Sequence, residues 1–297
     1  MQSPPQAGDS RIAHFNGQLL PLERISISPL DRGFIFGDGV YEVIPVYDGV
    51  PLRAREHFER LQRSMDEIAL QNPHTVDQWM RLTDELLRHH PGDQAVYIQV
   101  TRGAPAKRDH AIPKGLQPTV FMMANPMANP TREMIENGVA CVTSRDFRWE
   151  KCNIKSTSLL GNVLARQISV EAGAAETILF RDGLLTEASS SNVFVVKDGV
   201  VAAPPRDHLI LMGITYDLVM QLAKEGAVKL AMRPVPESEV RSADEIWLSS
   251  STKEVLAVTT LDGKPVGTGK PGPAFRRMHA LFQEHKAKLR SSRTLVA

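Results

Sequence analysis

The chain has 297 residues, of which 42% are hydrophobic, so it can bury a substantial core, and two domains are the default expectation. It carries 35 basic and 34 acidic residues, a net charge of +1. This balance leaves no excess of cationic side chains to follow a nucleic-acid backbone or an anionic membrane surface. We therefore expect neither of these partners.

The cysteines and the first residues indicate the cellular compartment. Cys141 and Cys152 have neither metal-ligand spacing nor a disulfide framework, which favours a reducing compartment, and we expect the cytoplasm. Residues 1–10 are rich in Gln, Ser, Pro and Gly and lack a basic start followed by an apolar stretch, so we expect a frayed tail and no signal peptide or anchor. Charges interrupt every hydrophobic segment before it reaches membrane-spanning length.

Apolar periodicity and turn pairs predict an α+β arrangement for the first half of the chain. In chain order the predicted elements are a hairpin around Asn16-Gly17, a Gly-rich stretch over 33–39, a strand over 40–47, helices over 55–70 and 76–90, and strands over 95–102 and 119–124. The segment 122–130 (MMANPMANP) contains two Asn-Pro pairs and is the best linker candidate, so we place a domain boundary near Asn125.

The second half is predicted to be richer in strands. Its elements are strands over 139–144, 177–180, 193–196, 200–202, 246–249 and 255–260, and helices over 157–172, from 213 and over 275–289. In the helix over 157–172, Leu160, Val163, Leu164 and Ile168 fall on one side, which predicts a face directed at the core.

Lys155 is the first candidate for chemistry. A single lysine is usually an exposed surface residue. This one follows an apolar-polar alternation and precedes the helix over 157–172. A lysine in that position can be partly desolvated, which lowers its pKa and frees the amine for imine formation.

Two further segments carry polar groups suited to a cofactor. The run 186–192 (TEASSSN) places Glu187 before three serines, which is either an ordinary polar turn or a carboxylate and hydroxyls that hold a ring. Gly213-Ile214-Thr215 begins a predicted helix, which is either an ordinary N-cap or a phosphate-binding end. Ser249-Ser250-Ser251-Thr252 adds hydroxyls, and Arg60 adds a cation, expected on the polar side of the first long helix.

The order of these segments carries a family resemblance. Residues 31–43 (DRGFIFGDGVYEV) resemble the opening motif of the fold type IV aminotransferases, particularly the D-amino-acid branch. The later motifs follow in the family's order: Glu56-His57 with Arg60, Ile154-Lys155-Ser156, Leu159-Leu160-Gly161-Asn162, the box over 187–194, and Gly213-Ile214-Thr215. The resemblance extends from about Phe15 to the last predicted helix.

The resemblance implies a fold and a set of cofactor contacts. It implies a smaller N-terminal α/β sandwich domain (residues 1–125) and a larger β-rich C-terminal domain (residues 126–297) with a pseudo-barrel that binds pyridoxal 5′-phosphate. Lys155 resembles the Schiff-base lysine that also moves the substrate proton, and Glu187 resembles the partner of the ring nitrogen. The remaining cofactor contacts implied are Arg60, Ser189, Ser190, Ser191, Asn192, Gly213, Ile214, Thr215, Ser250 and Ser251.

The resemblance also implies substrate contacts. Arg108-Asp109-His110 resembles the Arg-x-His pair that holds a substrate α-carboxylate from the neighbouring subunit of a homodimer, although one extra residue separates it from Thr101-Arg102-Gly103. Tyr41 matches the active-site tyrosine, and Arg148 matches an arginine near the cofactor. The implied reaction is ping-pong transamination, typically of D-alanine and 2-oxoglutarate to pyruvate and D-glutamate.

Other functions remain open at this point. An L-branched-chain aminotransferase and an aminodeoxychorismate lyase share the fold, and a binding domain that only stores the cofactor is a third alternative. A nicotinamide oxidoreductase is disfavoured because Gly33, Gly37 and Gly39 lack the G-x-G-x-x-G spacing.

Overall fold

The computed structural model describes residues 11–294, with side chains to residue 291, so the tail predicted over residues 1–10 lies outside the described part. The chain forms two compact units. Unit 1 runs up to Met127 and also contains Lys155–Ser158, and unit 2 contains Ala128–Ile154 and the chain from Leu159 onward. Among the described residues, no helix is long and apolar enough to cross a membrane.

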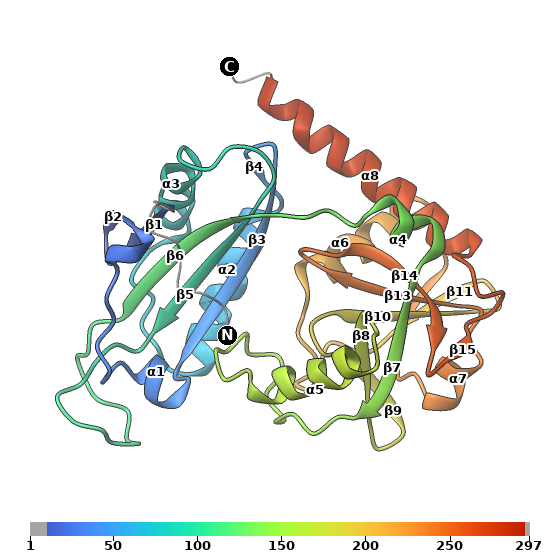
Figure 1. Cartoon of the computed structure of the whole chain (residues 1–297), viewed down its shortest axis with the longest axis horizontal. Helices are drawn as coiled ribbons and strands as arrows, with labels where there is room; N and C mark the ends of the chain where they lie inside the picture. The colour runs from blue at the N-terminus through green and yellow to red at the C-terminus, as the bar shows by residue number, and fades with distance from the viewer. Residues whose placement is uncertain (1–10, 295–297) are drawn as a thin grey trace. The chain divides into compact units, whose positions relative to one another are not determined.

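Unit 1 is an antiparallel sheet of six strands with helices on one face (Figure 1). The strand order is β2-β1-β6-β5-β3-β4. The strands are β1 (Ile12–Phe15), β2 (Gln18–Pro21), β3 (Gly39–Tyr47), β4 (Val50–Pro51), β5 (Gln94–Thr101) and β6 (Thr119–Pro126). The helices are η1 (Leu22–Arg24), α1 (Arg32–Phe36), α2 (Ala54–Glu67) and α3 (Val76–Leu87). The predicted hairpin is confirmed, since Asn16 and Gly17 both have the positive φ that its tight turn requires.

The two faces of this sheet differ in burial. Val40, Ile44 and Ile98 are fully buried under the helix layer, where Phe58 and Leu61 of α2 lie. Residues that alternate with them, such as Tyr41, Val43, Tyr97, Phe121 and Met123, remain partly exposed on the other face. Because successive side chains of a strand point to opposite faces, β3 presents one row to the core and one to the open side.

Unit 2 is built on a mixed sheet of nine strands in the order β12-β11-β10-β13-β14-β7-β8-β9, with β15 paired to β14. The strands are β7 (Val139–Arg145), β8 (Glu176–Arg181), β9 (Leu184–Ala188), β10 (Asn192–Lys197), β11 (Val200–Ala203), β12 (Leu230–Met232), β13 (Glu245–Ser250), β14 (Glu254–Leu261) and β15 (Lys264–Pro265). The helices are α4 (Arg132–Asn137), α5 (Leu160–Glu171), α6 (Ile214–Glu225), α7 (Glu237–Arg241) and α8 (Pro273–Thr294).

This sheet must curl, because β9 and β10 are separated in the strand order yet adjacent in sequence. Only residues 189–191 join them, and this connection can span at most about 14 Å from Ala188 to Asn192. A flat sheet would hold the two strands about 24 Å apart, at about 4.8 Å per strand. The curl encloses an apolar core that includes Ile178, Val193, Val195, Ile246, Leu248 and Val258.

Two predictions about these elements were wrong, and the linker prediction was right only in part, since the two units divide after Met127. Residues 122–126 of the proposed linker belong to β6, because a residue before proline favours the extended conformation that a strand also uses. Arg60 is only 4% exposed on the buried side of α2, because Glu42 of β3 pairs with its guanidinium. The helix predicted over 157–172 begins at Leu160, and its apolar face is open: Leu160 is 71%, Val163 60% and Leu164 51% exposed.

Small residues explain how α5 packs instead. Its buried residues are Ala165 and Ser169, and Thr177 at the start of β8 donates its hydroxyl to the Ala165 carbonyl at 2.7 Å. The helix therefore approaches the sheet through small side chains, and its large apolar side chains face outward.

Candidate active site

Lys155 belongs to unit 1 because its segment pairs with the start of β3. The Tyr41 amide donates to the Lys155 carbonyl at 2.9 Å, and the Thr157 amide donates to the Gly39 carbonyl at 2.9 Å. A side chain at Gly39 would meet the Val100 carbonyl at 2.8 Å, so glycine permits this crowded junction. The Lys155 amide also donates to the Ser64 hydroxyl of α2 at 3.2 Å. Four residues distant from unit 1 in sequence are thus fixed to its sheet.

The amine of Lys155 lies over an aromatic ring. Its Nζ is 4.2 Å from the centroid of the Tyr41 ring, within cation–π range. Within residues 11–294 this amine has no hydrogen bond or ion pair. It therefore combines partial burial with a nitrogen that no carboxylate holds, as a nucleophilic lysine requires.

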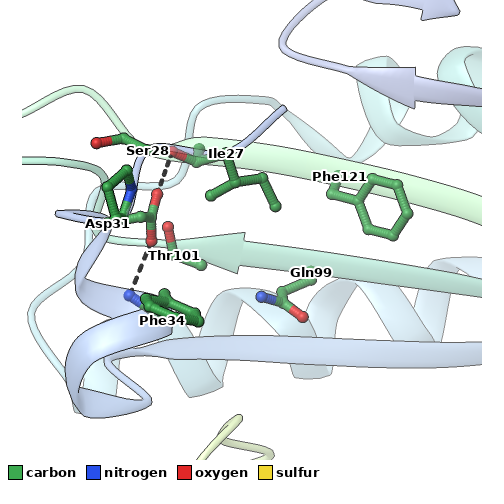
Figure 2. A pocket seen from close by; sticks show the side chains of 10 residues that line it. Ile27, Ser28, Asp31, Phe34, Gln99, Thr101 and Phe121 are labelled. Atoms are coloured by element: carbon green, nitrogen blue, oxygen red, sulfur yellow. Dashed lines mark hydrogen bonds between the residues drawn. The ribbon is translucent and has the colours of Figure 1, made fainter. Parts of the chain in front are cut away.

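A cavity of about 550 Å³ opens on the same face of the sheet. Gln99, which lines it, stands directly opposite Tyr41 in the β3–β5 register, so the two side chains share that face. Figure 2 shows Gln99 and Phe121 at one end of the cavity and Asp31 at the other. The other lining residues are Ile27, Ser28, Pro29, Gly33, Phe34, Thr101 and Thr119.

Glu42, the residue after Tyr41, points to the opposite face and holds Arg60. Arg60 donates to Glu42 through Nε at 2.7 Å and Nη2 at 2.8 Å, and His57 Nδ1 lies 2.8 Å from the same carboxylate. Burial raises the pKa of Glu42, but the charges and hydrogen bonds of Arg60 and His57 outweigh it and hold that pKa well below its usual range. Arg60 is thus a cation with a fixed orientation.

Arg108 and His110 lie together in the loop between β5 and β6, where both are exposed. The Arg108 guanidinium carbon is 4.8 Å from the centroid of the Phe36 ring, and the His110 ring is 5.1 Å from the same ring. The pair predicted from sequence is therefore gathered around one aromatic side chain of α1.

In unit 2, Glu187 stands on β9 and its two oxygens have three donors. Arg148 Nη1 donates at 2.5 Å, and both the Asn192 amide side chain and the Leu211 backbone amide donate at 3.1 Å. Arg148 in turn donates through its Nε and Nη2 to the Asp146 carboxylate, which fixes the orientation of the guanidinium. Burial raises the pKa of the Glu187 carboxyl above its usual value, and the charge and hydrogen bond of Arg148 only partly offset this rise.

The three serines after Glu187 surround a different carboxylate. The hydroxyls of Ser189, Ser190 and Ser191 all donate to Glu176, those of Ser190 and Ser191 at 2.6 and 2.8 Å. The Lys253 amine donates to the same Glu176 side chain at 2.8 Å. Glu176 and Lys253 were not predicted from the sequence. One signal was available, because Glu176 directly precedes the apolar stretch TILF of β8, and a carboxylate buried in such a strand needs a partner.

Helix α6 begins beside Asn192. Its N-cap is Gly213, which offers no side-chain acceptor to the first amides of Ile214 and Thr215. A side chain at position 213 would clash with Asn192 Oδ1, so only glycine fits. Ser250 ends β13, where its hydroxyl accepts from the Lys253 amide at 3.2 Å, and Ser251 follows in the turn to β14. No group of three possible metal ligands occurs within the described part of the chain.

Residues 39–261 match the family model of amino-transferase class IV, which covers more than half of the chain. The chain belongs to this family and is an aminotransferase.

Individual relatives agree with that assignment. D-alanine aminotransferase of Bacillus licheniformis is 40% identical over 270 residues, which cover 91% of this chain and 95% of the relative. Among solved structures, the branched-chain amino acid aminotransferase of Escherichia coli superposes with a TM-score of 0.87 at 25% identity, covering 93% and 94% of the two chains. A second branched-chain amino acid aminotransferase, solved with pyridoxamine 5′-phosphate, gives a TM-score of 0.87 at 25% identity and 95% coverage of both chains. The predicted fold type IV architecture is confirmed.

The Glu176 cluster yields a stability prediction. Glu176→Ala removes the carboxylate that accepts from three serine hydroxyls and from Lys253, and it leaves the Lys253 amine only the Ser190 and Ser191 oxygens, so the free energy of unfolding should fall by about 3 kcal/mol. Urea denaturation monitored by circular dichroism measures this, with Glu171→Ala on the exposed end of α5 as the control.

The effect should also depend on pH. Burial raises the pKa of Glu176, but Lys253 and the serine hydroxyls lower it overall. A carboxylate whose pKa is lowered by folding stabilises the protein above its unfolded-state pKa, and this stabilisation is lost as the pH falls and the group is protonated. The difference in the free energy of unfolding between wild type and Glu176→Ala should therefore narrow below about pH 4. A difference that stays constant down to about pH 3 would contradict an ionised Glu176.

Proposed function

We propose that this aminotransferase uses pyridoxal 5′-phosphate to exchange amino groups between a D-amino acid and a 2-oxo acid, with D-alanine and 2-oxoglutarate giving pyruvate and D-glutamate. The observation that carries the proposal is the 40% identity to a D-alanine aminotransferase over 95% of that protein's length. The branched-chain structures share the fold at 25% identity, which makes L-branched-chain transamination the second candidate.

The residues present fit the proposed cofactor. Lys155 offers an amine without a carboxylate partner, Glu187 offers a buried carboxylate, and α6 offers amides without a side-chain cap. When bound, pyridoxal phosphate supplies a ring that withdraws electrons from the substrate Cα. Lys155 belongs to unit 1, and Glu187 and α6 belong to unit 2.

In this proposal Lys155 holds the cofactor covalently and then acts as the proton carrier. Its Nζ accepts the proton from the substrate Cα, which requires a neutral amine, and holds that proton as an ammonium. The Tyr41 ring, whose centroid lies 4.2 Å from Nζ, contacts this amine and so holds it in position while the proton is carried.

Glu187 is proposed to face the ring nitrogen and keep it protonated. The donors Arg148, Asn192 and Leu211 orient the carboxylate: Oε2 accepts from Asn192 and Leu211, and Oε1, which accepts from Arg148, keeps a lone pair for a further hydrogen bond. Arg148 therefore acts on the cofactor through Glu187, which gives this residue a defined role.

The phosphate is proposed to bind at the start of α6. The amides of Ile214 and Thr215 point out of the helix end, where the helix dipole favours an anion. The hydroxyls of Ser250 and Ser251 in unit 2 would add further donors, and Arg60 of unit 1 is a phosphate contact that the family resemblance alone implies. A serine hydroxyl has one proton, and those of Ser189 to Ser191 already go to Glu176, so we propose that these three serines fix the segment beside Glu187.

The attachment of the cofactor is directly testable. Borohydride reduction of the pyridoxal-phosphate-loaded protein, followed by proteolysis and mass spectrometry, should place the pyridoxyl phosphate mass on the peptide that contains Lys155. Lys155→Ala should lack the adduct, and Lys151→Ala, which changes an exposed lysine four residues earlier, should keep it. An adduct on another lysine in the wild type would contradict the assignment.

The enantiomer preference tests the substrate. Wild type should transaminate D-alanine in preference to L-alanine, L-leucine or L-valine. If the Arg108 guanidinium binds the α-carboxylate, Arg108→Ala should lower kcat/KM for D-alanine by roughly thirtyfold to several thousandfold, corresponding to about 2 to 5 kcal/mol. The absorbance of the bound cofactor should not change. A wild-type preference for L-leucine would replace the D-amino-acid proposal with the branched-chain one.

We also propose a homodimer, supported by the open apolar face of α5. Leu160, Val163, Leu164 and Val170 of this helix are each more than half exposed, which is unusual for large apolar side chains at helical spacing. A cytoplasmic location is supported by two cysteines that are both buried and unpaired.

A charge on the α5 face should weaken the dimer. Leu164→Glu should shift the mass measured by light scattering from twice the 32.8 kDa chain mass toward the monomer at micromolar concentration, because an unpaired charge in an interface costs several kcal/mol. Leu164→Met preserves the apolar contact and should remain dimeric. A wild-type monomer, or a dimer unaffected by Leu164→Glu, would contradict this interface.

A further inference from the structure

The loop over residues 102–118 has no helix or strand of its own, yet it carries Arg108 and His110. Long exposed loops of this kind are mobile unless they are tied down. Two side chains that bind one carboxylate need a fixed separation, so something must hold the loop in place.

Arg32, the first residue of α1, holds the middle of this loop. Its Nη1 donates to the Asp109 carbonyl at 2.5 Å and to the Ala111 carbonyl at 3.3 Å, and its Nη2 donates to the His110 carbonyl at 3.3 Å. One guanidinium therefore binds three consecutive backbone carbonyls. The Arg32 amide also donates to the Gly103 carbonyl at 2.9 Å, at the base of the loop.

Asp38 sets the orientation of that guanidinium. Arg32 Nε donates to Asp38 Oδ2 at 2.7 Å, and Arg102 donates to both oxygens of the same carboxylate at 2.8 and 2.9 Å. Burial raises the pKa of Asp38, but hydrogen bonds from Arg102 and Arg32 lower it overall, so the carboxylate stays ionised. With its Nε edge on Asp38, Arg32 turns its two terminal nitrogens toward the loop.

Phe36 adds a contact to the side chains themselves. It stands one turn after Arg32 on α1, and the Arg32 guanidinium carbon lies 4.8 Å from its ring centroid. Arg108 lies at the same distance from this ring, and the His110 ring is 5.1 Å away. The loop backbone and the two side chains are thus fixed by residues of the same short helix.

We propose that Arg32 is a positioning residue for substrate binding: by holding the carbonyls of residues 109–111 it fixes Arg108 and His110 where they meet the substrate α-carboxylate. The inference rests on the proposed function, which gives Arg108 and His110 that role. Arg32 is itself 4% exposed and all of its guanidinium nitrogens are engaged within unit 1, so it acts through the loop.

Replacing Arg32 by lysine separates its charge from its shape. Lysine keeps the positive charge beside Asp38, but a single ammonium cannot donate to that carboxylate and to three carbonyls in the plane of a guanidinium. In Arg32→Lys the KM for D-alanine should rise roughly tenfold to hundredfold, while kcat stays within about threefold and cofactor absorbance is unchanged. Phe36→Leu, which keeps an apolar side chain, should shift KM in the same direction by less.

Two measurements on the cofactor-loaded protein test the proposal. Hydrogen–deuterium exchange of residues 104–118 should be faster in Arg32→Lys than in wild type, and Arg55→Lys, in an exposed ion pair of α2, is the matched control. In the second, Arg32→Lys is added to Arg108→Ala/His110→Ala. It should cause no further loss of kcat/KM for D-alanine, because Arg32 acts through those two residues.

The outcomes separate this proposal from the proposed function. Unchanged exchange in Arg32→Lys would overturn the anchoring. If Arg32→Lys lowers kcat/KM as much in the Arg108→Ala/His110→Ala background as it does in wild type, the route through Arg108 and His110 is overturned. If wild type does not transaminate D-alanine, the proposed function is wrong and the substrate part of this inference fails with it, while the exchange data still decide whether Arg32 anchors the loop.

Discussion

A carboxylate removed from water needs a cation and several hydrogen-bond donors around it, and in each unit of this aminotransferase the candidate site residues are arranged around such carboxylates. Glu42 is paired with Arg60, Glu187 with Arg148, and Glu176 with Lys253. Each pair joins different elements of one unit, and each fixes a segment to which the sequence assigned cofactor contacts. Removing one partner would leave an uncompensated buried charge, so these pairs restrict where the neighbouring functional residues can lie.

In unit 1, successive side chains of β3 point to opposite faces of the sheet, so the supporting ion pair and the candidate reactive group lie on different faces. In β3, Glu42 faces the helix layer and holds Arg60, while Tyr41 faces the open side and lies under the Lys155 amine. The cavity lined by Gln99 and Phe121 opens on that second face. A shift of β3 by one residue would exchange these two rows, which is why the register against β5 matters for the site.

In unit 2, the curl of the sheet decides where the candidate cofactor-binding residues lie. The short connection from β9 to β10 brings the last strand of the order next to the third, and residues 187–192 lie at this junction. Glu187 and Asn192 then share a hydrogen bond across the connection, and Glu176 collects the serine hydroxyls between them. The polar run is therefore partly strand and partly connection, with every side-chain oxygen of its serines committed to one carboxylate.

The local elements and the family could be predicted from the amino-acid sequence alone. The Asn16-Gly17 pair marked a tight turn, apolar spacing marked α2 and α3, and the ordered motifs around Lys155, Glu187 and Gly213 identified a class IV aminotransferase. These features depend on neighbouring residues, which the sequence displays directly.

Burial and side-chain contacts, in contrast, depend on how the elements pack in three dimensions. Packing joined residues 155–158 to the sheet of unit 1, buried Arg60, exposed the apolar face of α5, and directed the three serine hydroxyls to Glu176. Glu42 and Arg60 are 18 residues apart, and Glu176 and Lys253 are 77 apart. A periodic pattern indicates which side chains share a face, but the burial of that face depends on the element that covers it, and a charged side chain can be buried only where a distant partner compensates it.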